Sequence, residues 1–244
     1  MIVRKIRRIA QFSFGTIANY GLLSLDPRQK ARPRETRDRW VQAWAQGLLR
    51  AFNVSVLDGS RIPTFQSALV VANHRAALDV PLLLSRFGGR IVGRGDLADW
   101  PLLGKPAKGI GTLFLDRTDL RSALTTMREM ETALRSGDRI LLFPEGTTFA
   151  DDEVRPFAPG SFLSAIRANV PVVPVGIAYK GDSAVFVGES FGKHLWRASA
   201  TRSTEVAMVV GEPMSFSRKE ASIAHERVRE RVQLLVLEAR KQLG

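Results

Sequence analysis

The chain has 244 residues, of which 45% are hydrophobic and 25% charged, as expected for one large globular domain or for a domain with an appendage. A formal net charge of +12 indicates an anionic partner, such as nucleic acid, an anionic membrane surface or a phosphorylated substrate. The absence of cysteine excludes disulfides, thiolate metal sites and a cysteine nucleophile.

Residues 1–50 carry most of the excess positive charge, with eleven Lys or Arg against three Asp or Glu. They include an uncharged run, residues 9–25, that contains Phe12, Phe14 and Tyr20. A membrane-spanning helix needs about 20 mostly apolar residues, and this run is shorter and more polar, so we expect an interfacial helix. The flanking basic side chains would each attract anionic headgroups by about 1 kcal/mol.

Three other interpretations of this segment remain open or are disfavoured. A short spanning anchor stays possible on length. A secretory signal is disfavoured because no small-residue cleavage site follows the apolar run. A nucleic-acid arm is disfavoured because the aromatic residues are not interleaved with the basic ones, so we expect no nucleic-acid partner.

The next segment, around Pro33, is rich in Arg and is predicted to be a solvated linker. From Thr36 the apolar residues recur at helical spacing and predict a helix, through Trp40, Trp44, Leu48, Leu49 and Phe52. We therefore divide the chain into a membrane-associating helical segment, residues 1–53, and a catalytic domain, residues 54–244.

The first chemically informative stretch follows a short apolar strand, Ala68–Ala72, which itself comes after a strand at residues 54–57. His74 comes just after that strand, and Asp79 lies five residues further on, just before Pro81, which suits the first turn of a helix. A carboxylate folded back onto one ring nitrogen leaves the other, Nε2 or Nδ1, free to take a proton from a hydroxyl. The alternative is a structural polar pair.

The elements that follow alternate between strands and helices. A helix over residues 80–85 stops at Gly88, and the basic Gly/Lys stretch 104–109 is expected to be a loop. Strands are predicted at 91–93, within 111–117, at 139–143, 170–178, 184–187 and 205–210, and helices at 122–134, 161–168 and from Ser217 onward. Two prolines in 170–178 predict an edge strand or a bulge. Alternation of this kind predicts an α/β fold.

Two further strands end in polar residues. The strand within 111–117 ends at Asp116 and Arg117, whose guanidinium can offer a bidentate fork to a phosphate, although a surface ion pair is the simpler explanation. The strand at 139–143 runs into Pro144, Glu145 and Gly146, a tight turn that would project one carboxylate. His194 and His225 have no comparable motif and are expected to be structural or exposed.

Four stretches in this order, Asn73 to Asp79 (N-H-x4-D), Gly111 to Arg117, Phe143 to Thr147 (F-P-E-G-T) and Val170 to Val175, resemble the glycerolipid acyltransferase family, which includes the 1-acylglycerol-3-phosphate acyltransferases. The resemblance covers about residues 65–180 and implies a mixed central sheet flanked by helices. It implies catalytic roles for His74 and Asp79. It also implies contacts with the acceptor by Asn73, Arg117, Glu145, Gly146 and Thr147.

One position departs from the family pattern in an informative way. The residue after the F-P-E-G-T motif is usually arginine, and here it is Thr148. A missing cation weakens the case for 1-acylglycerol-3-phosphate as acceptor and keeps a lyso-ornithine lipid, or a lysophospholipid with a headgroup, as the alternative. The segment 156–160, where the family often has a lysine, is also uncharged.

The expected reaction is direct transfer of an acyl chain from a thioester to a lysolipid hydroxyl, without an acyl-enzyme. No cluster of metal ligands with suitable spacing occurs, so we expect no metal, and direct transfer from a thioester leads us to expect no cofactor. The donor would be acyl-CoA or acyl-carrier protein, and the enzyme would lie on an anionic membrane, at the cytoplasmic face. A lipid-binding protein without activity is the alternative from another class.

Overall fold

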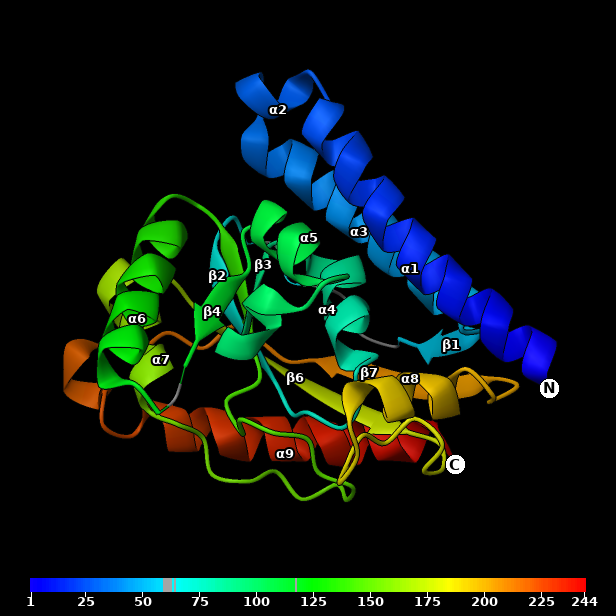
Figure 1. Cartoon of the computed structure of the whole chain (residues 1–244). Coiled ribbons are helices and arrows are strands. Elements are labelled where there is room, and N and C mark those ends of the chain that lie inside the picture. Colours follow the sequence, from blue (N-terminus) through cyan, green and yellow to red (C-terminus); the bar gives the residue numbers. More distant parts are fainter. Residues whose placement is uncertain (59–62, 64, 117) are drawn as a thin grey trace.

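The computed structural model describes residues 1–58, 63, 65–116 and 118–244, and in this part of the chain seven strands form one sheet (Figure 1). The strand order is β1-β7-β6-β2-β5-β3-β4, and every neighbouring pair is parallel except β6 with β7. The predicted α/β class with a mixed central sheet is confirmed. The strands are β1 Val54–Leu57, β2 Ala68–Ala72, β3 Arg90–Arg94, β4 Leu113–Leu115, β5 Arg139–Leu142, β6 Val172–Tyr179 and β7 Thr204–Val210.

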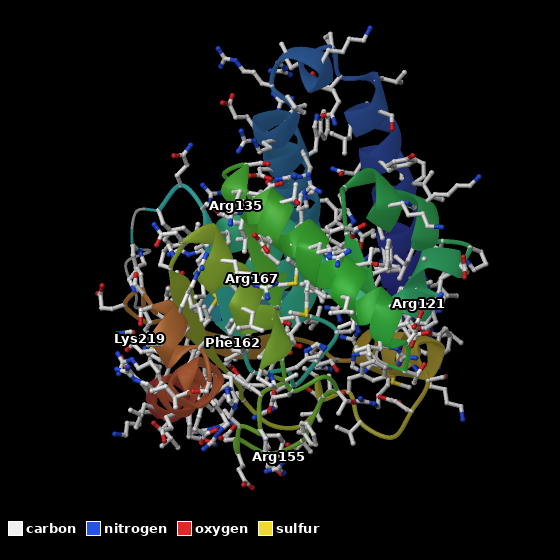
Figure 2. The ribbon with its side chains drawn as sticks, turned by 90° about the vertical axis from the view of Figure 1, so that its left-hand side faces the viewer. Arg121, Arg135, Arg155, Phe162, Arg167 and Lys219 are labelled. Carbon is white, nitrogen blue, oxygen red and sulfur yellow. The ribbon has the colours of Figure 1, made fainter. Side chains whose placement is uncertain are left out.

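Helices cover both faces of the sheet, because the central strands are apolar on both sides. One face packs against α3 Pro33–Ala51, α4 Asp79–Phe87 and α8 Phe191–Ala198. The other face packs against α6 Leu120–Arg135, α7 Gly160–Ala168 and α9 Ala224–Gln242. Figure 2 looks onto this second layer, where Arg121 and Arg135 mark the two ends of α6 and Arg167 lies on α7.

The N-terminal segment is a helical hairpin. Helix α1 (Ile2–Leu25) runs back along α3, and the short helix α2 (Arg28–Ala31) joins them at the far end (Figure 1). The predicted interfacial helix is thus confirmed as a helix and starts earlier than residue 9. The predicted solvated linker around Pro33 is wrong, because Pro33 is the first residue of α3, where its missing N–H costs nothing.

The bend between α1 and α3 is held by the buried carboxylate of Asp26. It accepts hydrogen bonds from the Arg28 backbone and side chain, from the Arg39 guanidinium and from Trp40 Nε1, the last at 2.8 Å. These donors hold the pKa of Asp26 well below its ordinary value, the hydrogen bond from Trp40 contributing most. Among the described residues, no helix is both long enough and apolar enough to cross a bilayer.

A buried ion-pair network ties α3 to the sheet. Arg37 is 5% exposed and binds the carboxylates of Asp38 and Asp138, and Asp138 lies just before β5. Arg90, at the start of β3, also pairs with Asp138, with its Nε 2.8 Å from Oδ2. Because removing one partner of such a group leaves an unpaired buried charge, the network fixes the position of α3 on the domain.

Strand β6 contradicts one prediction and confirms its alternative. It contains Pro174 yet lies in the middle of the sheet, between β7 and β2, so it is not an edge strand. A bulge accommodates the proline. Val175 pairs with Val210 and Val172 pairs with Met214, so an advance of three residues along β6 is matched by four residues along the facing chain. The carbonyl of Pro174 accepts a hydrogen bond from the N–H of Gly211, and the Pro174 nitrogen lies on the same side of the strand. The nitrogen therefore faces the bulge, where the missing N–H removes little of the hydrogen bonding between the strands.

Three other predictions of secondary structure are corrected. Residues 184–187 are not a strand, because Phe186 uses its backbone groups on the loops of Arg75 and Thr148. Residues 104–109 are a short helix, α5 (Gly104–Gly109), in place of the predicted loop. The last helix begins at Ala224, because Ser217 caps a separate short 3-10 turn.

Helix α9 lies directly on β6 at Gly176. A Cβ atom at this position would lie 2.2 Å from the carbonyl carbon of Leu235 and 2.4 Å from the nitrogen of Val236, both backbone atoms that cannot move alone. We expect Gly176→Ala to lower the free energy of unfolding by about 1–3 kcal/mol through overpacking. Urea unfolding followed by circular dichroism measures this change.

Gly47→Ala, in the middle of α3, is the matched control because nothing lies within 4 Å of the added Cβ. It should raise the free energy of unfolding by about 0.5–1 kcal/mol through helix propensity. Equal effects of the two substitutions would contradict the packing of α9 on β6.

Candidate active site

The site forms where two neighbouring strands end. Strands β2 and β5 are parallel and in register, with Val71 opposite Leu142, so the segments that follow them emerge at the same edge of the sheet. His74 follows β2, and Glu145 follows β5. The carboxyl edge of parallel strands is the usual place for a site in an α/β fold, and here it brings together two motifs about 70 residues apart in the chain.

His74 and Asp79 form the predicted pair. The Nδ1 atom of His74 lies 2.8 Å from Oδ2 of Asp79. Asp79 is the first residue of α4, so the positive end of the helix dipole also favours its negative charge. The sequence predicted that the chain after His74 turns into a helix and brings the carboxylate back to the ring. The structure shows this arrangement.

The carboxylate of Asp79 is fully buried and receives hydrogen bonds from three further groups. Oδ2 accepts from the backbone N–H groups of Arg75 and Ala76 at 2.6 and 2.8 Å. Oδ1 accepts from the hydroxyl of Tyr179, at the end of β6, at 2.6 Å. Burial, followed by the charge of Asp79, raises the pKa of Tyr179 well above its ordinary value, so the phenol stays protonated and donates.

This arrangement decides which nitrogen of His74 can act as a base. Asp79 accepts on both oxygens, so the Nδ1–H of His74 donates to it and Nε2 keeps its lone pair. The ring of Phe143 stacks on the imidazole, with centroids 4.1 Å apart and planes 12° apart, and so fixes its orientation. The His74 side chain is 19% exposed, so the imidazole is partly open to the surrounding pocket.

Asn73 and Glu145 are in structural positions. Asn73 is fully buried, and its side-chain amide pairs with both backbone groups of Ile177 at 2.9 and 2.8 Å, which extends the contact of β2 with β6. The Glu145 side chain is also buried and accepts from the N–H of His74 at 2.6 Å and of Arg155 at 3.0 Å. Direct contact of either residue with a substrate stays a prediction.

The guanidinium of Arg75 completes the group around Glu145. It lies 3.4 Å from the carboxylate and donates to the carbonyls of His74 and Glu153. Arg75 is 2% exposed, so the pair neutralises two buried charges while holding the two loops together. The sequence offered no signal for this pairing beyond the presence of an arginine after the histidine.

The other predicted acceptor residues lie on the same edge or fall outside the description. Gly146, with φ of 86°, and the exposed Thr147 line a pocket that also contains His74. Thr148 lines it too, but its hydroxyl donates to the carbonyl of Phe186. Arg117 is not among the described residues, and its predicted contact with a phosphate stays a prediction.

The pocket runs from His74 between the sheet and the N-terminal hairpin. Its volume is about 560 Å³, and most of its lining is apolar. The walls come from α1, α3, α4 and α8, through residues that include Phe12, Trp44, Leu84 and Phe191, and from the segment around α5, through Trp100, Ala107 and Ile110. The helical stripe predicted from Trp40 to Phe52 therefore packs on the domain and forms one wall of the pocket.

Two polar residues of the site were missed by the sequence analysis. Tyr179 is the residue after the predicted strand at 170–178, and nothing in the sequence pairs it with Asp79. His194 was expected to be structural or exposed in a loop, whereas it lies in α8, is 2% exposed and lines the same pocket as His74. The available signal was the i, i+3 spacing of His194 and Arg197, with Glu189 five residues before the histidine.

Glu145 provides a test of the paired loops. Glu145→Ala removes the acceptor for two backbone N–H groups and leaves the Arg75 charge buried and unpaired, so we expect the free energy of unfolding to fall by about 3–5 kcal/mol. Glu153→Ala, whose side chain is 74% exposed, should change it by less than about 0.5 kcal/mol. Similar urea midpoints for the two variants would contradict the structural role of Glu145.

Comparisons with known proteins agree with this geometry. The family model described as Acyltransferase matches residues 53–178. A lyso-ornithine lipid O-acyltransferase of Pseudomonas aeruginosa is 33% identical over 184 residues, which cover 73% of this chain and 70% of that protein. A 1-acyl-sn-glycerol-3-phosphate acyltransferase of Neisseria meningitidis is 30% identical over 150 residues, which cover 61% of this chain and 59% of that protein.

Among solved structures, the 1-acyl-sn-glycerophosphate acyltransferase of Thermotoga maritima has the same fold. Its TM-score is 0.74 at 23% identity, and the match covers 98% of this chain and 95% of that one. The family model spans the segment that contains β2, the His74 and Asp79 pair, β5 and the Glu145 turn. The chain therefore belongs to the acyltransferase family of enzymes.

Proposed function

We propose that this enzyme transfers an acyl chain from an acyl thioester to the hydroxyl of a lysolipid, with 1-acylglycerol-3-phosphate as the first candidate acceptor. The observation that carries the proposal is the position of His74, which lines a mostly apolar pocket and whose Nε2 is not used by Asp79. A general base at one end of an apolar pocket suits a reaction in which one substrate supplies a hydroxyl and the other an acyl chain. The relatives' names support the lysolipid as acceptor.

The chemistry follows from the dyad. Nε2 of His74 removes the proton of the acceptor hydroxyl as the oxygen attacks the thioester carbonyl carbon, and Asp79 stabilises the imidazolium that forms. The carbon–oxygen bond of the new ester forms, the carbon–sulfur bond breaks, and the imidazolium gives its proton to the departing thiolate. No acyl-enzyme is required, and no cofactor beyond the thioester takes part.

The acyl chain of the thioester would lie in the apolar pocket, which begins beside His74 and is bordered by the N-terminal hairpin. Burial of the chain there would contribute about 0.8 kcal/mol per CH₂ group, enough to favour long-chain donors. Both candidate donors, acyl-CoA and acyl-carrier protein, present the thioester on the same pantetheine arm. A protein that binds lipid without catalysis is the less favoured alternative, because the dyad is complete and its base is accessible.

A lyso-ornithine lipid is the second candidate acceptor, and Thr148 favours it. The family usually has an arginine after the F-P-E-G-T motif, and here the Thr148 hydroxyl bonds to the Phe186 carbonyl. The site therefore has no cation at this position to pair with a phosphate. The relative from Pseudomonas aeruginosa, which carries the name of a lyso-ornithine lipid acyltransferase, supports this candidate.

We also propose that the hairpin of α1 and α3 binds the surface of an anionic membrane at its cytoplasmic face. Helix α1 exposes large apolar side chains toward solvent: Ile2, Val3, Ile6, Phe14, Ile17, Leu22 and Leu25. Arg4, Lys5 and Arg7 flank them with positive charge. Apolar side chains bordered by basic ones suit an interfacial helix, and the acyl pocket beneath would then lie close to the lipid that supplies its substrates.

The base has a direct test. We expect His74→Ala to lower the rate of thioester-dependent acyl transfer by about 10² to 10⁴, because proton removal from the acceptor is lost. Release of thiol from acyl-CoA or acyl-carrier protein is followed with a colorimetric disulfide reagent, with 1-acylglycerol-3-phosphate and a lyso-ornithine lipid as acceptors. The protein has no cysteine, so it adds no background.

His225→Ala is the control, because His225 lies on α9, on the other face of the sheet, and should keep the wild-type rate. The acceptor that supports His74-dependent release identifies the substrate. Wild-type rates in the His74→Ala variant, or no acceptor-dependent release by folded wild-type protein, would contradict the proposed reaction.

Membrane binding is tested by flotation with vesicles. Binding to phosphatidylglycerol vesicles should exceed binding to phosphatidylcholine vesicles and should fall as salt rises toward 1 M, where the Debye length is about 3 Å. Phe14→Glu should weaken it, whereas Leu120→Glu, a leucine on α6 with 74% exposure against 75% for Phe14, should not. Equal binding by both variants would contradict the role of α1.

A further inference from the structure

A second histidine belongs to the pocket but has no part in the dyad. His194, on α8, is 2% exposed, and its ring stacks on Phe186 with centroids 4.4 Å apart. Its Nδ1 lies 3.1 Å from Oε1 of Glu189, and the guanidinium of Arg197 binds the same carboxylate. The chain therefore fixes this imidazole on two sides, as it does for His74.

The hydrogen bonds of Arg197 determine the tautomer of His194. The NH2 group of Arg197 has two hydrogens, and it uses them on Glu189 and on the carbonyl of Val185. The 3.1 Å contact between that NH2 group and Nδ1 of His194 is then not a hydrogen bond to the ring. Nδ1 carries the proton and donates to Glu189, and Nε2 keeps a lone pair.

The lone pair on Nε2 has no partner of its own. Within the described part of the chain, the polar contacts of the His194 ring are made by Nδ1. Nε2 is not one of the buried side-chain atoms that lack a partner, so it is not closed off from solvent. Burial, with a further contribution from Arg197, lowers the pKa of His194 below its ordinary value, so the ring is neutral at pH 7. A neutral acceptor therefore lies in the wall of a mostly apolar pocket.

The loops of the dyad hold this wall in place. The Phe186 N–H donates to the carbonyl of Arg75 at 2.9 Å, and the Phe186 carbonyl accepts from Thr148. His194 stacks on the ring between these two contacts. The second histidine is thus fixed relative to His74, and both line the same pocket.

We propose that Nε2 of His194 accepts a hydrogen bond from an amide N–H of a substrate in this pocket. The inference rests on the proposed function, in which the reacting hydroxyl is committed to His74. Two substrates carry an amide: the pantetheine arm of any thioester donor, and an amide-linked lysolipid such as a lyso-ornithine lipid. 1-Acylglycerol-3-phosphate has none.

The kinetic test compares His194→Phe, which keeps the ring on Phe186 but removes the acceptor, with His194→Gln, whose amide oxygen can replace Nε2. His194→Phe should raise one KM about tenfold with little change in kcat, because ground-state binding is lost, and His194→Gln should restore most of it. A rise in the KM of acyl-CoA with either acceptor identifies the pantetheine arm. A rise confined to the lyso-ornithine lipid identifies the acceptor.

His225→Phe is the matched histidine control and should leave both KM values unchanged. The proposal is overturned if neither KM rises more than twofold in His194→Phe. It is also overturned if His194→Gln is as impaired as His194→Phe, or if the only change is a lower melting temperature, because these outcomes indicate a purely structural role.

A measurement independent of turnover separates this inference from the proposed reaction. In ¹⁵N-histidine-labelled His74→Ala protein, only His194 and His225 remain, since the chain has three histidines. The Nε2 resonance of His194 should be that of an unprotonated nitrogen and should move upfield when palmitoyl-CoA or lyso-ornithine lipid is added. A resonance that stays unchanged with both ligands rejects the inference even if the wild-type enzyme transfers acyl chains.

Discussion

The site depends on the hydrogen bonds that the buried carboxylate of Asp79 accepts. A negative charge in the interior is tolerated only when its oxygens are well bonded, and here two backbone N–H groups, a phenol and an imidazole all donate to it. The same bonds close the loop after β2, set the tautomer of His74 and attach that loop to β6 through Tyr179. One charged group therefore fixes both the shape and the chemistry of the active edge.

The second loop of the site depends on a similar arrangement around Glu145. Its carboxylate binds the N–H of His74 and is paired with Arg75, so the F-P-E-G-T turn supports the dyad from behind. The hydroxyl of the nearby Thr148 donates a hydrogen bond to the carbonyl of Phe186, and the ring of Phe186 stacks on the ring of His194. Glu145, which the family resemblance assigns to the acceptor, and the nearby Thr148 thus build the framework that holds two histidines along one pocket.

The N-terminal hairpin is joined to the domain by buried polar contacts as well as by the core. Arg8, 2% exposed, donates to the carbonyls of Ser199, Thr201 and Arg202 just beyond α8, and Arg37 binds Asp138 beside β5. These anchors keep one side of α1 on the protein and leave Phe14 and Ile17 exposed on the other. The helix that we expect to meet the membrane is therefore also a wall of the pocket that we propose for the acyl chain, next to α8 and His194.

What the sequence determined by itself is local. Apolar runs and turn residues located most strands and helices. Only four residues separate His74 from Asp79, and a helix was expected to start there, so the pairing of the two could be predicted from the sequence. Four ordered motifs identified the family. The tertiary structure alone decided the contacts of Tyr179 with Asp79 and of Glu145 with His74, which join residues 100 and 71 positions apart. It also decided the central place of β6 and the burial of His194. Such contacts depend on strand order and helix packing, which are set by the whole core, so no local pattern records them.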